Sequence, residues 1–137
     1  MRRMDATEIV RAFFAKAELR DESAFDLIAT DYMQHAAGPQ GRDGFRLTLG
    51  IVDHDLDRPT VEVHNLYGEG DLVTVHLTLH GRHVASTMPL LAAVPVSNQT
   101  VSWQYIHIFR VADGLIAEHW ACRDDVGLLA QVGAWPR

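Results

Sequence analysis

The sequence predicts an α+β domain in which N-terminal helices pack in the concave face of a curved antiparallel sheet. Apolar residues before Pro59 recur at the 3.6-residue spacing of helices, whereas those after it alternate with the period of two that is typical of strands. Turn-forming residues divide this second half into several runs, as in a meander. Helices followed by strands indicate an α+β fold. The 137 residues have the size of one domain, so we expect residues 1–137 to form a single unit.

The first helix is predicted to begin after Asp5 or Thr7, because either side chain can accept a hydrogen bond from the first turn. Glu8 lies three residues after Asp5, as in a capping box. The buried stripe of this helix is formed by Ile9, Val10, Phe13, Phe14 and Ala17.

Two further helical segments and a short strand complete the first half. A short helix that includes Ile28 follows Asp21 or Ser23, and a strand covers residues 32–36. After a turn rich in glycine and proline, residues 42–52 form a helix whose inner face is Phe45, Leu49 and Val52.

The second half is predicted to hold four strands, covering about residues 61–66, 73–80, 100–111 and 115–123. Gly-Asp and Asp-Gly pairs mark the two hairpin turns. Residues 84–98 form an irregular apolar segment between the second and third strands. Asp124 or Asp125 can cap a closing helical turn.

Composition excludes several classes of function. Eighteen acidic and twelve basic residues give a net charge of −6, which argues against a nucleic-acid partner. No apolar run approaches the roughly 20 residues of a membrane-spanning helix, and the first residues lack the apolar run of a signal peptide. We therefore expect a cytoplasmic protein without a membrane partner. A single cysteine, Cys122, excludes an internal disulfide and a multi-cysteine zinc site.

The register of the last hairpin decides which of its residues share a face. A two-residue turn at Asp113-Gly114 pairs Ala112 with Leu115 and His107 with Trp120. This register gathers one set of side chains on one face: Trp103, Tyr105, His107, Phe109, Glu118, Trp120 and Asp124. A three-residue turn with a bulge shifts the register by one, so that His107 faces His119 and Asp124 leaves that face.

The predicted face combines aromatic rings with carboxylates and an imidazole, which suits a ligand pocket that carries acid–base groups. A carboxylate beside aromatic walls is desolvated, which raises its pKa and makes it a better general base near neutral pH. A neighbouring imidazole can donate a hydrogen bond to a developing enolate oxygen. These residue types permit proton abstraction next to a carbonyl group without a cofactor.

Several segments share the pattern of a known family: YMQH at residues 32–35, GRDGF at 41–45, GDLVTVH at 70–76, HIFRVADGLIAEHW at 107–120 and DDVGLLAQVG at 124–133. Together they resemble the SnoaL-like polyketide cyclases over nearly the whole chain. The resemblance implies a cone-shaped fold of the nuclear-transport-factor-2 type, usually in a homodimer.

The resemblance also implies the chemistry. In these cyclases an aspartate near the end of the last strand is the acid–base catalyst of an intramolecular aldol ring closure, and Asp124 matches it, three residues before Gly127. His107 and His35 match pocket positions. We therefore expect catalytic roles for Asp124, His107 and His35 on a bulky apolar carbonyl substrate. The predicted substrate-binding residues are Tyr32, Trp103, Tyr105, Phe109, Glu118 and Trp120.

Other interpretations stay open. Asp124 can simply cap the closing helix in a module that binds a small molecule without chemistry, or it can activate water in a hydrolase. A metal site is not expected, because the chain has no His-Glu-x-x-His motif. Asp53, Asp55 and Asp57 have the spacing that begins a calcium loop, but Arg58 stands where such a loop needs glycine.

Overall fold

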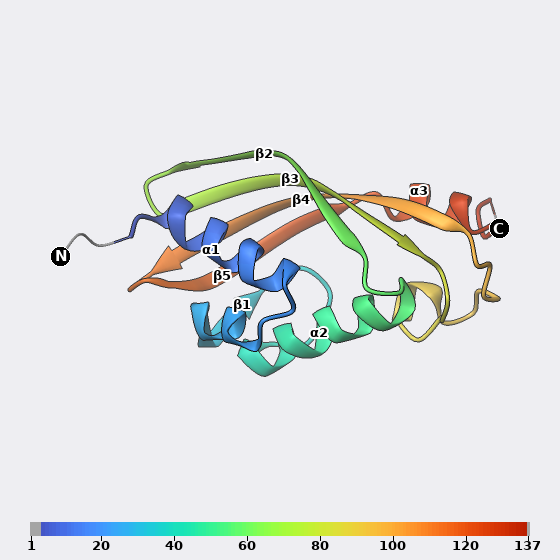
Figure 1. Ribbon diagram of the computed structural model, residues 1–137, viewed down its shortest axis with the longest axis horizontal. Coiled ribbons are helices and arrows are strands. Elements are labelled where there is room, and N and C mark those ends of the chain that lie inside the picture. The colour runs from blue at the N-terminus through green and yellow to red at the C-terminus, as the bar shows by residue number, and fades with distance from the viewer. Residues whose placement is uncertain (1–3, 137) are drawn as a thin grey trace.

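The computed structural model describes residues 4–136 and consists of a strongly twisted five-stranded sheet with helices on one face (Figure 1). The strand order is β1-β5-β4-β3-β2. The elements are α1 (Ala6–Glu18), the 3₁₀ helix η1 (Glu22–Leu27), β1 (Ile28–Gln34), α2 (Gly41–Asp55), β2 (Thr60–Glu69), β3 (Leu72–Arg82), the 3₁₀ helix η2 (Pro89–Leu91), β4 (Thr100–Ala112), β5 (Leu115–Arg123) and α3 (Asp125–Gln131). The α+β class predicted from the sequence is confirmed.

Helix α1 crosses the sheet and packs on β2 to β5, whereas α2 packs on β1 (Figure 1). Asp5 caps α1 by accepting a hydrogen bond from the Glu8 backbone nitrogen at 2.9 Å. The predicted stripe buries Ile9, Val10 and Phe13 against the sheet. Among residues 4–136, no helix combines the length and the apolar character needed to cross a membrane.

The sheet is mixed rather than wholly antiparallel. Strand β1 begins at Ile28, which the sequence had assigned to the preceding helix, and it pairs in parallel with β5. Ile28 lies opposite Ile116, and both side chains are fully buried. This pairing joins segments about 90 residues apart, so local periodicity carries no signal of it.

The hairpin between β4 and β5 has the predicted turn but not the predicted register. Asp113 and Gly114 both have positive φ, as in a two-residue type I′ turn, and Ala112 pairs with Leu115. The register then shifts by one residue at Ala117, which lies between the residues that pair with Val111 and Arg110. From there to the end of β5 every pairing differs from the prediction.

The bulge corrects the predicted faces. His107 pairs with Ala121 rather than Trp120, and Phe109 pairs with His119. His119 and Arg123 therefore share the helix-covered face with His107. Glu118 and Trp120, which were expected beside His107, lie on the opposite face because a one-residue shift reverses every side chain.

Residues 84–98 close one end of the molecule. Met88, Leu91 and Val94 from this segment are buried in a cluster with Trp103 of β4 and Leu128 of α3. The buried carboxylate of Asp55, at the end of α2, holds the start of the segment through several hydrogen bonds.

Candidate active site

A row of rings lies on the helix-covered face of β4. The ring centroids of Trp103 and Tyr105 are 4.8 Å apart, those of Tyr105 and His107 are 5.0 Å apart, and those of His107 and Phe109 are 5.4 Å apart. Phe14 of α1 faces this row, 6.5 Å from the His107 ring. Trp103 and Phe109 are buried, whereas Tyr105 and His107 keep some accessible surface. The accessible part of the row is therefore an imidazole beside a phenol.

A chain of hydrogen bonds connects His107 to the edge of the sheet. His107 Nδ1 lies 2.6 Å from His119 Nε2, and His119 Nδ1 lies 2.7 Å from Gln34 Oε1. The three residues come from the adjacent strands β4, β5 and β1. His119 is only 5% exposed, and its ring stacks between Phe109 and Tyr32.

Burial keeps both imidazoles neutral. Burial, together with the positive charge that His119 can carry, holds the pKa of His107 well below its ordinary value. Burial, followed by repulsion from His35, lowers the pKa of His119 from 6.5 to about 4. Neutral imidazoles can each donate one hydrogen bond and accept another.

A cation and a phenol lie beside this chain on the same face. The guanidinium of Arg123 lies 5.3 Å from the centroid of Trp103, and its Nη2 is 3.0 Å from Asp125 Oδ2. Burial raises the pKa of the Tyr105 hydroxyl, so it stays protonated and able to donate. Asp125 Oδ1 is buried and has no hydrogen bond within residues 4–136.

Asp124 lies apart from this group. Its Oδ1 accepts a hydrogen bond from the Gly127 backbone nitrogen at 2.9 Å, which caps α3, and the residue is exposed. Its backbone nitrogen donates to the carbonyl oxygen of Gln104 at 3.0 Å. The structure gives Asp124 the capping geometry that the sequence allowed, and its catalytic role stays a prediction.

His35, Glu118 and Trp120 meet on the outer face of the sheet. His35 Nε2 lies 2.6 Å from Glu118 Oε2, and the His35 ring stacks on Trp120 with centroids 4.8 Å apart. The Nε atom of Arg110 donates to Glu118 Oε1 at 2.6 Å. This hydrogen bond, and then the one from His35, lower the pKa of Glu118. Three predicted site residues thus form a separate cluster on the face away from His107.

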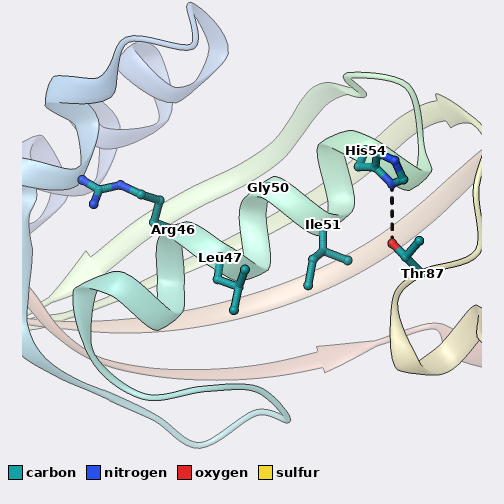
Figure 2. Close-up of a pocket in the computed structure, with 6 residues that line it drawn as sticks. All are labelled: Arg46, Leu47, Gly50, Ile51, His54 and Thr87. Atoms are coloured by element: carbon teal, nitrogen blue, oxygen red, sulfur yellow. Dashed lines mark hydrogen bonds between the residues drawn. The ribbon is translucent and has the colours of Figure 1, made fainter.

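Among the depressions on the surface of residues 4–136, one lies beside this cluster and another along α2. The smaller, about 230 Å³, is on the outer face beside this cluster and is lined by His35, Ile106, Ile108, Trp120, Ala121 and Cys122. The larger, about 410 Å³, lies along α2 and is lined by Arg46, Leu47, Gly50, Ile51, His54 and Thr87. Figure 2 shows Leu47 and Ile51 projecting from the same side of α2. Phe45 and Leu49 of the same helix pack in the core instead.

The structure divides the predicted site. Tyr32, Trp103, Tyr105, His107 and Phe109 lie on the helix-covered face, although Tyr32 is buried in core packing. Sequence reasoning missed His119, Gln34 and Arg123. The bulged register, which was weighed for the last hairpin, is the signal that would have found His119. Among the described residues, no group of three or more His, Cys, Asp or Glu side chains has the geometry to hold a metal ion.

The sequence and the fold match those of known proteins. The family model described as SnoaL-like polyketide cyclase matches residues 6–132, and the chain belongs to this family. It is 35% identical over 123 residues to nogalonic acid methyl ester cyclase of Streptomyces nogalater, covering 85% of this chain and 89% of that protein.

Solved structures agree with the family. TsrD of Streptomyces laurentii has a TM-score of 0.82 at 26% identity, over 98% of both chains. IdmH of Streptomyces antibioticus has a TM-score of 0.80 at 25% identity, over 95% of this chain and 99% of that one.

Proposed function

We propose that this protein is a polyketide cyclase that performs cofactor-independent acid–base chemistry on a bulky apolar carbonyl substrate. The observation that carries the proposal is the position of His107, a neutral imidazole that keeps accessible surface within a row of aromatic rings. Family membership supports a cyclase, and the name of the Streptomyces nogalater relative supports a polyketide methyl ester as the substrate class.

In this proposal His107 is the general base. Its free ring nitrogen removes a proton next to a carbonyl group, and the resulting enolate carbon attacks a second carbonyl of the same molecule to form the new carbon–carbon bond. The imidazolium then returns the proton to the alkoxide oxygen, so the product has the same mass as the substrate. A positioned base of this kind contributes roughly 10²–10⁴-fold to the rate.

Tyr105 and Arg123 are the proposed electrophilic groups. The Tyr105 hydroxyl stays protonated, and the Arg123 guanidinium adds a fixed positive charge near the same face. Preorganised donors aimed at a developing oxyanion stabilise it most strongly where water is excluded. Trp103 and Phe109 are the proposed apolar walls beside them.

The reaction class is tested by the mass of the product. The protein is incubated with nogalonic acid methyl ester and aklanonic acid methyl ester, the compounds for which the Streptomyces relatives are named. We expect a product of unchanged mass with one additional ring. Release of methanol with the free carboxylic acid, which is lighter than the substrate by one CH₂, indicates the hydrolase interpretation. A ligand that binds and is recovered unchanged indicates a binding module.

We also propose a homodimer formed through the outer face of the sheet. Ile106 is 48% exposed and Ile108 is 36% exposed on neighbouring outward positions of β4, beside Trp120. Ile106→Glu is expected to give the monomer mass in light scattering, whereas Leu47→Glu on α2 serves as a control that leaves the mass unchanged. A monomeric wild-type protein would contradict the dimer.

A further inference from the structure

We propose that Gln34 and His119 are positioning residues that fix the tautomer of His107, so that its Nδ1 carries the proton and its Nε2 presents a free lone pair. This inference rests on the proposed function, in which His107 is the base. It assigns a role to two residues that are not expected to touch the substrate.

The side-chain amide of Gln34 has an orientation that its contacts define. Its Oε1 lies 3.1 Å from the backbone nitrogen of Ala36, and a backbone N–H can only donate. This contact identifies the atom as the oxygen and excludes a flipped amide. The backbone of Gln34 is held by the side chain of Gln40, because Gln40 Oε1 accepts from the Gln34 backbone nitrogen at 2.7 Å and Gln40 Nε2 donates to the Gln34 carbonyl oxygen at 2.8 Å.

The donor and acceptor roles along the hydrogen bonds from Gln34 to His107 follow from the identity of this oxygen. Gln34 Oε1 lies 2.7 Å from His119 Nδ1, so Nδ1 carries the proton and donates. A neutral imidazole has one proton, so His119 Nε2 is an acceptor. That acceptor lies 2.6 Å from His107 Nδ1, which must then donate. His107 Nε2 is left without a proton, and it has no hydrogen bond within the described part of the chain.

Strand pairing and ring packing hold the chain in this orientation. Gln34 and His119 are direct partners between β1 and β5, and His119 is the direct partner of Phe109, two residues from His107 on β4. The His119 ring is stacked at 4.7 Å on Phe109 and at 6.2 Å on Tyr32, which restricts its rotation. The hydrogen bond that one imidazole nitrogen makes determines which nitrogen is free for chemistry.

The charged and titratable groups around these hydrogen bonds are compatible with a proton on Nδ1 of His107. His35, which follows β1 and donates its backbone N–H to the His119 carbonyl oxygen, opposes the protonation of His119. Tyr105 stacks on His107 and Tyr32 on His119, both with protonated hydroxyls. None of these groups supplies a carboxylate that would favour imidazolium in the resting state. When His107 accepts a proton at Nε2, its Nδ1 can keep donating to His119.

The test reads the tautomer directly. Protein labelled with ¹⁵N in histidine is examined by long-range ¹H–¹⁵N correlation, which distinguishes a protonated ring nitrogen from a bare one. We expect a protonated Nδ1 and a bare Nε2 for His107 in the wild type. A protonated Nε2 overturns the inference, whatever the activity of the enzyme.

A variant of Gln34 tests the consequence for turnover. Gln34→Met keeps the length of the side chain but removes the acceptor, and we expect a mixed tautomer at His107 with kcat reduced about tenfold to a hundredfold and KM little changed. Leu47→Glu, at an exposed position of α2 away from this hydrogen-bond chain, is the control, which should keep the tautomer and kcat. If Gln34→Met changes the tautomer but leaves kcat unchanged, the positioning role is wrong. Full activity of His107→Gln would instead overturn the proposed function itself.

Discussion

Replacing Asp124 by alanine is expected to lower the free energy of unfolding by about 1 kcal/mol, because it removes the side chain that caps α3. The capping hydrogen bond is 2.9 Å long and exposed, which favours the middle of the range of about 0.5–2 kcal/mol for such caps. In a chain of 137 residues, a loss of about 1 kcal/mol corresponds to a fall in Tm of roughly 3–4 °C.

Asparagine at position 124 separates the effect of losing the helix cap from the effect of losing the negative charge. Asparagine caps helices about as well as aspartate, so Asp124→Asn should keep its Tm close to that of the wild type. If His107 is the base, the kcat of Asp124→Asn on a polyketide methyl ester should also stay within about twofold of the wild type. Thermal unfolding and turnover are measured on both variants. A hundredfold loss of kcat in Asp124→Asn with an unchanged Tm would make the carboxylate the catalyst and refute this reasoning.

Gly127 provides an independent check of the cap. A Cβ atom at this position would collide with the carboxylate of Asp124, so Gly127→Ala must displace the capping side chain. In the Asp124→Ala background that collision is absent, and alanine at position 127 should stabilise α3 because alanine has a higher helix propensity than glycine. The double-mutant cycle should therefore be clearly non-additive. Additive changes in free energy would show that Asp124 does not hold the position described.

Two further predictions concern buried polar groups. The pKa of His119 in the native state lies below its value in the unfolded chain, so the contribution of this residue to the free energy of unfolding is complete above about pH 6.5 and is lost as the pH falls toward about 4. Urea unfolding across this pH range should therefore show a weaker acid dependence of stability in His119→Gln than in the wild type. An unchanged acid dependence would contradict this role of His119. Asp55 is fully buried and accepts hydrogen bonds from the Thr87 backbone and hydroxyl and from the Met88 backbone at 2.6–2.8 Å. Asp55→Asn places an amide donor against one of these donors, so it should lower the free energy of unfolding by about 2–3 kcal/mol and speed hydrogen exchange in residues 84–98. A nearly unchanged free energy of unfolding would refute the anchoring role of Asp55.

Local patterns were sufficient for most elements. The stripe from Ile9 to Phe14 and the cap at Asp5 predicted α1, and the alternation of Val73, Val75 and Leu77 predicted the buried face of β3. Asp113-Gly114 predicted the turn of the last hairpin. In each case the physical cause lies within a few residues of the signal.

The site was harder to predict because its geometry depends on distant segments. One extra residue at Ala117 reverses the faces of Glu118 and Trp120 and brings His119 beside His107, and no turn signal marks that bulge. Gln34 reaches His119 only because β1 pairs in parallel with β5. The family pattern predicted His107 as a site residue, but it carried no information about the chain of hydrogen bonds behind the ring.

The most direct test of the proposed base is the turnover of His107→Gln. Glutamine is a polar replacement that cannot act as a base, so kcat on a polyketide methyl ester should fall at least a hundredfold. Near-UV circular dichroism and Tm, measured on the same sample, establish that the aromatic row remains packed. Turnover within a few-fold of the wild type, in a folded His107→Gln variant, would contradict the assignment of His107 as the general base.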